Sequence, residues 1–314
     1  MKIVFLSRYQ KTVERGAENF VTELSQKLSE NNQVEVLSGT DSDSLNKILR
    51  EKYDVVIPMN GRLQALKASL GRLRRGYKLL ITGQSGIGRD DIWNIFIKPD
   101  IFVALTDYQR MWAEHWTWGS KLVKIPNGVD LKKFTPSGNK INLKLERPII
   151  LSVGVLTWYK YHDRLIQAAK LLRSGSVLIV GQGPDKERLQ QLGRKLLGDR
   201  FAILNFSYQD MPKLYRSVDL FTLPSWDREA FGIVYLEAMA SGLGVVAPDD
   251  LSRHEIVGNG GLFVDVSDSQ KYAKVIDEAL KTDWSKKARS QAEKFSWDKI
   301  AKEYEKIMLD LVAK

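Results

Sequence analysis

Residues 223–250 read LPSWDREAFGIVYLEAMASGLGVVAPDD and decide how the second half of this chain folds. The apolar run Asp219–Leu223 predicts a strand that closes at Pro224 and Ser225. An amphipathic helix is predicted to begin after Gly232 and to end near Gly242. A strand, a loop and a helix in this order are typical of α/β folds.

The start of this helix is a candidate anion site. The backbone amides of residues 231–234 lack acceptors within the helix, and the helix dipole favours a negative charge there by about 0.3–1 kcal/mol at an exposed site. Gly232 lets a ligand approach the backbone closely, so a diphosphate is the expected guest.

Two carboxylates flank this glycine. Glu229 lies in the loop and Glu237 lies about two helical turns further on, and each can accept hydrogen bonds from hydroxyl groups. The pattern favours a sugar linked to a phosphate, with one carboxylate facing the sugar and the other the ribose. The alternative is that Glu229 belongs to a solvated loop and Glu237 to an exposed helix face.

Length and composition indicate a globular protein of two domains. At 314 residues the chain exceeds the usual size of a single domain. Hydrophobic residues make up 43% and charged residues 27%, and no apolar run approaches the roughly 20 residues that span a bilayer. The absence of cysteine excludes disulfides and thiolate metal sites. The first residues, MKIVFLSRYQK, turn polar too early for a secretory signal, so we expect a cytoplasmic protein.

Apolar runs alternate with helical patterns, which predicts parallel sheets covered by helices. A polar stretch at residues 134–148 interrupts the alternation, and we place the linker there. The predicted fold is α/β, with two Rossmann-like, doubly wound domains that face a central cleft. The predicted strands are KIVFLS, VEVLS, VVIPM, KLLITG, IFVALT and LVKIPN before the linker, and PIILSVG, SVLIVG, FAILNF, LFTLPS and GVVAP after it. Helices are predicted over residues 17–28, 45–51, 62–78, 162–172, 186–197 and 297–312.

Residues 223–250 closely resemble the nucleotide-sugar segment of glycosyltransferase family 4, whose retaining members carry an E-x7-E element on a GT-B fold. IPNGVDLKKFTP, residues 125–136, resembles the element that joins the domains of these enzymes. The resemblance covers nearly the whole chain. It implies an N-terminal acceptor domain over residues 1–140, a nucleotide-sugar domain over 147–296, and a last helix, 297–314, that crosses back to the N-terminal domain.

The resemblance also implies an activity, namely transfer of a sugar from a nucleoside-diphosphate sugar to an acceptor hydroxyl with retention of configuration. Glu229 would orient the donor sugar and Glu237 the ribose, while Lys160 and the amides after Gly232 would stabilise the leaving diphosphate. Neither a divalent metal nor a cofactor is required, and Asp41-Ser42-Asp43 is interpreted as a loop that caps a helix. The other donor contacts implied are Gly16, Gly154, Gly183, Phe206, Met211, Ala230, Phe231, Gly232, Ile233 and Val234.

Several positions depart from the family pattern. Val155 stands where relatives commonly have arginine and Tyr161 where they have glycine, so the diphosphate clamp is reduced. Arg15, Arg164 or Arg228 are the cations considered as replacements. Gln84 and Ser85 lie where many relatives have a histidine near the reacting sugar; with Arg15 they are the acceptor-side candidates. The three histidines, His115, His162 and His254, are interpreted as surface or capping residues.

Residues 62–78 combine leucines at helical spacing with a cluster of basic residues, in a chain of net charge +10. Such a helix can lie on an anionic membrane face, or it can bury its leucines in its own domain and leave the basic residues in water. Nucleic acid is not an expected partner, because no RNA-recognition or zinc-finger pattern occurs. The residues concerned are Leu63, Leu66, Leu70 and Leu73 and the basic Arg62, Lys67, Arg72, Arg74 and Arg75.

The expected partners are a nucleoside-diphosphate sugar and a saccharide or lipid-linked acceptor, as in the synthesis of glycans, glycolipids or cell-envelope polysaccharides. The inner face of the cell membrane is the second location considered, because of the basic helix. Two other functions stay open. A sugar-nucleotide epimerase shares the architecture, although the E-x7-E segment speaks against it. A basic adaptor that binds nucleotide sugar or membrane without turnover is favoured by the missing arginine and histidine.

Overall fold

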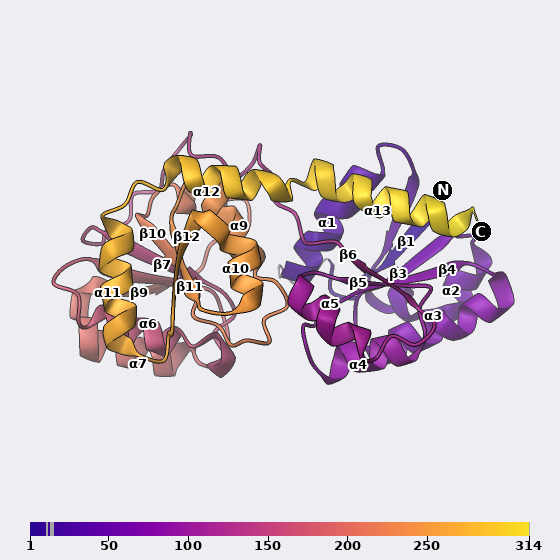
Figure 1. The fold of residues 1–314 in the computed structure, drawn as a ribbon, viewed down its shortest axis with the longest axis horizontal. Coiled ribbons are helices and arrows are strands. Elements are labelled where there is room, and N and C mark those ends of the chain that lie inside the picture. Colours follow the sequence, from indigo (N-terminus) through magenta and orange to yellow (C-terminus); the bar gives the residue numbers. More distant parts are fainter. Residues whose placement is uncertain (11, 13–15, 314) are drawn as a thin grey trace. The chain divides into compact units, whose positions relative to one another are not determined.

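The computed structural model describes residues 1–10, 12 and 16–313, which form two compact units. Unit 1 comprises the N-terminal residues up to Gly128, Arg228–Phe231 and the residues from Ser296 onward; unit 2 comprises Val129–Asp227 and Gly232–Phe295. Each unit holds a six-stranded parallel sheet covered by helices (Figure 1), which confirms the predicted class of two doubly wound domains. The predicted linker at residues 134–148 lies within unit 2.

The sheet of unit 1 has the strand order β2-β1-β3-β4-β5-β6. Its strands are β1 Lys2–Leu6, β2 Gln33–Leu37, β3 Val55–Pro58, β4 Lys78–Thr82, β5 Ile101–Ala104 and β6 Lys121–Lys124. The helices of this unit are α1 Gly16–Leu28, α2 Leu45–Arg50, α3 Arg62–Arg75, α4 Arg89–Phe96, α5 Asp107–Glu114 and α13 Trp297–Val312.

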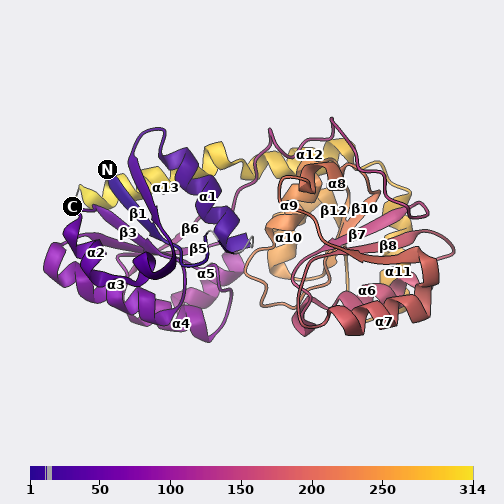
Figure 2. The same ribbon diagram turned by 180° about the vertical axis from the view of Figure 1, so that it is seen from behind.

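Alternating side chains of β1 build a core on each face of this sheet, as expected for a strand buried on both sides. Ile3 and Phe5 pack with residues of α1 and α13, whereas Val4 and Leu6 pack with residues of α2 to α5. Figures 1 and 2 show α13 running beside α1. Two aromatic contacts join these helices, from Phe20 to Trp297 at 5.8 Å and from Phe20 to Tyr304 at 6.0 Å between ring centroids.

The sheet of unit 2 has the order β12-β11-β10-β7-β8-β9. Its strands are β7 Ile149–Val153, β8 Ser176–Val180, β9 Phe201–Leu204, β10 Leu220–Thr222, β11 Val245–Pro248 and β12 Gly261–Val264. The α-helices are α6 His162–Ala169, α7 Lys186–Leu197, α8 Met211–Tyr215, α9 Ile233–Ala240, α10 Leu251–Val257, α11 Ser269–Leu280 and α12 Ser285–Ala292. Helix α6 packs against α7 and α11, and α9 packs against α8, α10 and α12.

The basic helix predicted over residues 62–78 forms α3, but its leucines are not buried. The interpretation that α3 buries its leucines in its own domain is wrong, because Leu63, Leu66, Leu70 and Leu73 are all exposed. The helix instead packs through small or polar residues, namely Gln64, Ala65, Ala68 and Gly71. Close packing at Gly71 explains this choice, since a Cβ there would collide with the side chains of Leu45 and Tyr77.

Gly128 allows α13 to dock in unit 1, and its substitution tests that packing. A Cβ at Gly128 would stand 2.5 Å from the indole ring of Trp297, which is 4% exposed, so Gly128→Ala must displace the ring. We expect Gly128→Ala to lower the free energy of unfolding by about 1–3 kcal/mol, measured by chemical denaturation. The control is Gly88→Ala in the same unit, where nothing lies within 4 Å of the added Cβ and the effect should stay within about 0.5 kcal/mol. Equal effects of the two changes would contradict the packing argument.

Candidate functional site

The sheet of unit 2 changes the direction of its strand order between β7 and β10, which are hydrogen-bonded neighbours. In open parallel sheets a crevice forms at such a point, outside the carboxyl ends of the strands, and ligands bind there. The segments that leave these two carboxyl ends are Gly154–Tyr161 after β7 and Leu223–Gly232 after β10. The second of them is the loop that was singled out in the sequence.

Gly232 starts α9 in the way that the sequence predicts. It adopts the left-handed conformation, with φ 81° and ψ 62°, as the N-cap of Ile233–Ala240. A residue with a Cβ would be strained there. The amides of Ile233 and Val234 are in the first turn, where a helix provides no acceptor, so they remain the candidate donors to an anion.

Glu237 lies on α9 and is buried, with 3% of its surface exposed, which excludes the exposed helix face that was the alternative. Its Oε2 accepts a hydrogen bond of 2.8 Å from the hydroxyl of Tyr215. Burial, followed by the neighbouring Glu237 carboxylate, raises the pKa of Tyr215 well above its ordinary value, so Tyr215 remains a donor. Glu229 is half-buried in the loop and groups with unit 1.

Lys160 follows β7 at the end of a short 3₁₀ turn, Trp158–Lys160. The Cβ position of Gly154 is 3.8 Å from Cδ of Lys160 and 3.8 Å from Nε2 of His162, so both side chains lie next to the end of β7. Val155, in the place of the family's arginine, is exposed. Lys160 therefore lies at this strand end, and its role as the cation for a diphosphate stays a prediction.

The proposed replacements for that arginine have varied surroundings. The guanidinium of Arg164 lies 3.8 Å from the ring centroid of Tyr161, in a cation–π contact. Arg228 is exposed and groups with unit 1. Arg15 lies outside the described residues.

His162 corrects a second prediction, because it is neither a surface residue nor a cap. It is 1% exposed, and its Nδ1 lies 3.1 Å from Oγ of Ser152 in β7. Burial, together with the Lys160 ammonium, lowers the pKa of His162 to about 4, so the ring is neutral at pH 7. The other two histidines agree with the prediction: His115 contacts the carbonyl of Met111 at the end of α5, and exposed His254 pairs with Asp249.

The turn after β8 contains two glycines because it packs closely against the segment that follows β7. Gly181 has φ 153° and Gly183 has φ 157°. A Cβ at Gly181 would clash with the carbonyl oxygen of Gly154, and one at Gly183 would lie 2.7 Å from the amide nitrogen of Leu156. A side chain at either position would push this turn away from the segment that carries Lys160.

Arg253, which the sequence did not reveal, holds the loop after β10. Its guanidinium is fully buried and donates to Oγ of Ser225 at 2.8 Å and to the carbonyl of Trp226 at 2.6 Å. It also forms an ion pair of 3.0 Å with Asp250. Arg253 therefore acts as a positioning residue for the loop that leads to Gly232.

An aromatic cluster joins the loops after β7 and β10. The amide of Trp226 donates to the carbonyl of Tyr159 at 3.0 Å, and their rings stack at 5.1 Å between centroids. Trp158 meets Trp226 edge-on at 5.4 Å and is exposed. These contacts hold the segments after β7 and β10 against each other.

The remaining predicted donor and acceptor contacts have varied surroundings, and one of them is buried. Met211 is 5% exposed at the start of α8, so its side chain belongs to the core, whereas Phe206 is half-buried in the loop after β9. In unit 1, Gly16 is the first residue of α1 and Ser85 is exposed. The amide of Gln84 is paired with that of Asn127 through two hydrogen bonds, of 2.8 and 3.1 Å.

The family model for "Glycosyl transferases group 1" matches residues 134–296, just over half of the chain. The chain belongs to this family. The matched residues include β7 to β12 and the segments that follow β7 and β10.

Relatives and solved structures agree with this assignment. The chain is 33% identical to exopolysaccharide phosphotransferase SCO2592 of Streptomyces coelicolor over 68% of its length and 24% of that protein. It is 29% identical to phosphatidyl-myo-inositol mannosyltransferase of Mycolicibacterium smegmatis over 63% of its length and 54% of that protein. The chain thus spans between about a quarter and about half of these curated relatives.

The fold of this family member matches that of Anabaena Alr3699/HepE, solved in complex with UDP and glucose. The TM-score is 0.82 at 17% identity, covering 98% of this chain and 99% of the other. This likeness confirms the predicted GT-B fold.

The D-x-D segment lies in unit 1. Asp41 pairs with Lys47 at 2.6 Å and Asp43 pairs with Arg8, so both carboxylates of the D-x-D segment have cationic partners. Across residues 1–10, 12 and 16–313, no cluster of histidine and acidic side chains is arranged to hold a metal ion. A search of the same residues finds no helix that is both long and apolar enough to cross a bilayer.

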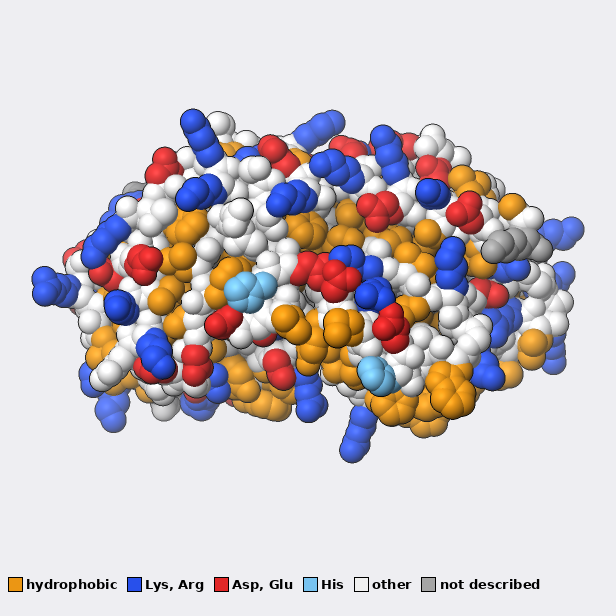
Figure 3. Space-filling view, in the orientation of Figure 1, with side chains coloured by type: hydrophobic (Ala, Val, Ile, Leu, Met, Phe, Trp, Pro, Cys, Tyr) orange, Lys and Arg blue, Asp and Glu red, His pale blue; other side chains and the backbone are white. Residues whose placement is uncertain are grey.

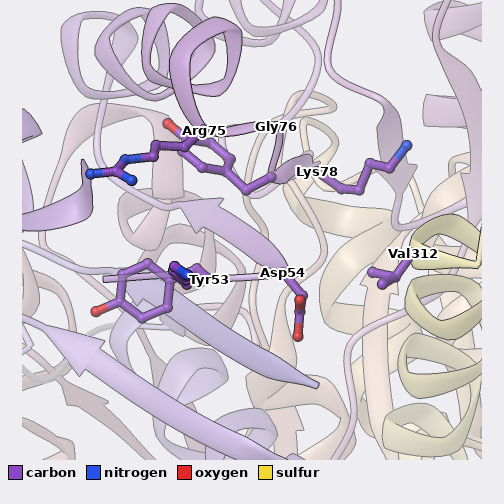
Figure 4. Close-up of a pocket in the computed structure, with 8 residues that line it drawn as sticks. Tyr53, Asp54, Arg75, Gly76, Lys78 and Val312 are labelled. Carbon is purple, nitrogen blue, oxygen red and sulfur yellow. The ribbon is translucent and has the colours of Figure 1, made fainter. Parts of the chain in front are cut away.

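A pocket of about 310 Å³ lies in unit 1 (Figure 4). Tyr53 and Asp54 precede β3, and Arg75, Gly76 and Tyr77 precede β4, so the pocket is at the amino ends of the strands. Ligands of doubly wound sheets bind at the opposite ends, and we therefore assign no part of the site to it.

Buried His162 predicts a pH dependence of stability. Its pKa is about 4 in the folded protein and about 6.5 when unfolded, so below pH 6.5 the unfolded chain binds a proton that the folded chain does not. The free energy of unfolding should then fall as the pH drops from 6.5 towards 4, by up to about 1.4 kcal/mol per pH unit. Denaturant unfolding at several pH values measures this contribution as the difference between the natural protein and His162→Gln.

The comparison with His162→Gln is required because Asp91 changes the free energy of unfolding with pH in the opposite direction to His162. Burial raises the pKa of Asp91 to about 8, which makes the protein less stable as the pH rises from about 4 to 8. Asp91 is present in both proteins, so its contribution cancels. Identical pH profiles for the two proteins would contradict the account of His162.

Proposed function

We propose that this protein is a retaining glycosyltransferase that moves a sugar from a nucleoside-diphosphate sugar to an acceptor hydroxyl. One observation carries the proposal: a helix with a glycine N-cap, α9, begins at the switch point of a doubly wound sheet and carries a buried carboxylate, Glu237, in its second turn. The family match covers this helix, and the E-x7-E spacing of Glu229 and Glu237 supports the retaining class.

Binding of the donor would use both charge and hydrogen bonds. The amides of Gly232 to Val234 and the ammonium of Lys160 would hold the diphosphate, and Glu237, oriented by Tyr215, would accept hydrogen bonds from the ribose. Glu229 would orient the donor sugar. The other donor contacts are those predicted from the sequence, with Met211 the weakest because it is buried.

The reaction breaks the bond between the anomeric carbon and the diphosphate oxygen through an oxocarbenium-like transition state. The acceptor oxygen bonds to the same face of the sugar, and its proton passes to the leaving phosphate. Negative charge grows on the diphosphate, where fixed amides and Lys160 can contribute several kcal/mol of stabilisation. No imidazole base is needed, in keeping with His162, whose burial lowers its pKa to about 4 and makes it a weak base.

The acceptor class that we propose is a lipid-linked saccharide, bound on the N-terminal side of the chain, residues 1–140. The name of the Mycolicibacterium relative specifies a phosphatidyl-inositol, which supports a lipid acceptor. A second candidate function, an adaptor that binds nucleotide sugar without turnover, is favoured by Val155 in the place of the arginine.

Product stereochemistry tests the proposed reaction. We expect incubation with α-linked UDP, GDP or ADP sugars and a lipid-linked saccharide to yield an α-linked product, because retention leaves the configuration unchanged. The coupling of the anomeric proton in the NMR spectrum of the product measures this. A β-linked product would disprove retention, and binding of donor with neither transfer nor hydrolysis would favour the adaptor.

Lys160 offers a separate test of the donor site. Lys160→Gln removes the cation beside Gly154 and should weaken binding of the nucleoside diphosphate by about 10-fold, equivalent to about 1.4 kcal/mol. Isothermal titration calorimetry measures the dissociation constant. The matched control is Lys170→Gln, which makes the same change at an exposed position just after α6. Equal affinities for the two variants would remove Lys160 from the site.

A further inference from the structure

Helix α3 directs a stripe of leucines into the solvent. Leu63 is 75% exposed and Leu73 is 79% exposed, and Leu66 and Leu70 lie between them at helical spacing. At about 100° per residue, the four leucines fall on one side of the helix, nearly opposite the buried side that contains Ala65 and Ala68. Large apolar side chains on the outer side of a helix contribute nothing to the core of their own unit.

The apolar surface continues onto the neighbouring elements of unit 1. The guanidinium of Arg62 lies 5.9 Å from the ring centroid of Trp93 in α4, which joins the two helices. Phe96 then meets Trp116 at 6.1 Å, just beyond α5. Figure 3 shows apolar side chains gathered over α4 at the margin of the unit. We call this surface the α3–α4 face; its exposed apolar residues are Leu63, Leu66, Leu70, Leu73, Trp93, Phe96 and Trp116.

The α3–α4 face is also positively charged. The sequence of α3, RLQALKASLGRLRR, contains basic residues and no acidic ones. Asp90 pairs with Arg62 at 2.7 Å and Asp100 pairs with Arg72 at 3.2 Å, which neutralises part of the charge. Lys67, Arg74 and Arg75 are exposed beside the leucines.

We propose that the α3–α4 face docks on an anionic lipid bilayer. Leucine and tryptophan side chains can enter the boundary between headgroups and acyl chains, while lysine and arginine remain at the anionic headgroups. A second copy of the chain is a poorer partner, because a symmetric contact would bring the basic residues of two α3 helices together. The proposal concerns binding alone and does not depend on the transfer reaction.

Vesicle flotation of the full chain without substrate tests this proposal. We expect the protein to float with vesicles of phosphatidylcholine mixed with phosphatidylglycerol, to bind vesicles of phosphatidylcholine alone more weakly, and to be released by salt. The double substitution Leu63→Glu with Leu73→Glu should reduce the bound fraction by about 10-fold or more, because it replaces apolar contacts by charges that the headgroups repel. Both positions are largely exposed, so the melting temperature should not change.

The matched control changes the same residue type elsewhere. Leu171 and Leu309 are 52% and 51% exposed and lie outside the α3–α4 face, so Leu171→Glu with Leu309→Glu alters the net charge equally. We expect this control to bind vesicles like the natural protein. Equal loss in both double variants would overturn the proposal. So would a dimer, detected by light scattering, that only the Leu63 and Leu73 variant dissociates while vesicle binding stays the same.

Discussion

The reversal of strand order between β7 and β10 is the constraint on which the candidate site depends. Because crossovers between parallel strands are right-handed, the connections that leave β7 towards β8 and β10 towards β11 place their helices on opposite faces of the sheet. In open parallel sheets, the carboxyl ends of the strands at such a point are where ligands bind. The loop after β7 carries Lys160, and the loop after β10 leads to the start of α9.

These two loops are long, and specific contacts hold them in place. Buried Arg253 binds Ser225 and the carbonyl of Trp226, and Trp226 binds the backbone of Tyr159. Removal of a buried guanidinium would leave its partners unsatisfied, which typically costs 1–3 kcal/mol or more. The position of α9 relative to β7 thus rests on a polar network. With Val155 in the place of an arginine and His162 neutral, the backbone amides of α9 and Lys160 carry the anion-binding role in this account.

The fold could be predicted from the sequence where the local residue pattern and the burial of the side chains indicate the same element. The parallel strands alternate with helices as predicted, and Gly232 begins its helix with the positive φ that only glycine adopts easily. The short strand β12, Gly261–Val264, escaped prediction because it follows a glycine-rich turn and has few residues to show a pattern. His162 and Arg253 were missed because polar residues near helix starts usually face water, whereas here tertiary contacts bury them. The leucines of α3 were misjudged for the opposite reason, since a helical apolar stripe normally faces its own core.

The most direct test of the central claim is to follow backbone amide resonances of ¹⁵N-labelled protein during titration with a nucleoside diphosphate. The account predicts that the largest shifts occur at Gly232, Ile233 and Val234, accompanied by Gly154 and Lys160, because the anion would accept hydrogen bonds from the first turn of α9. Shifts confined to the pocket between Tyr53 and Lys78, or to unit 1 alone, would contradict it.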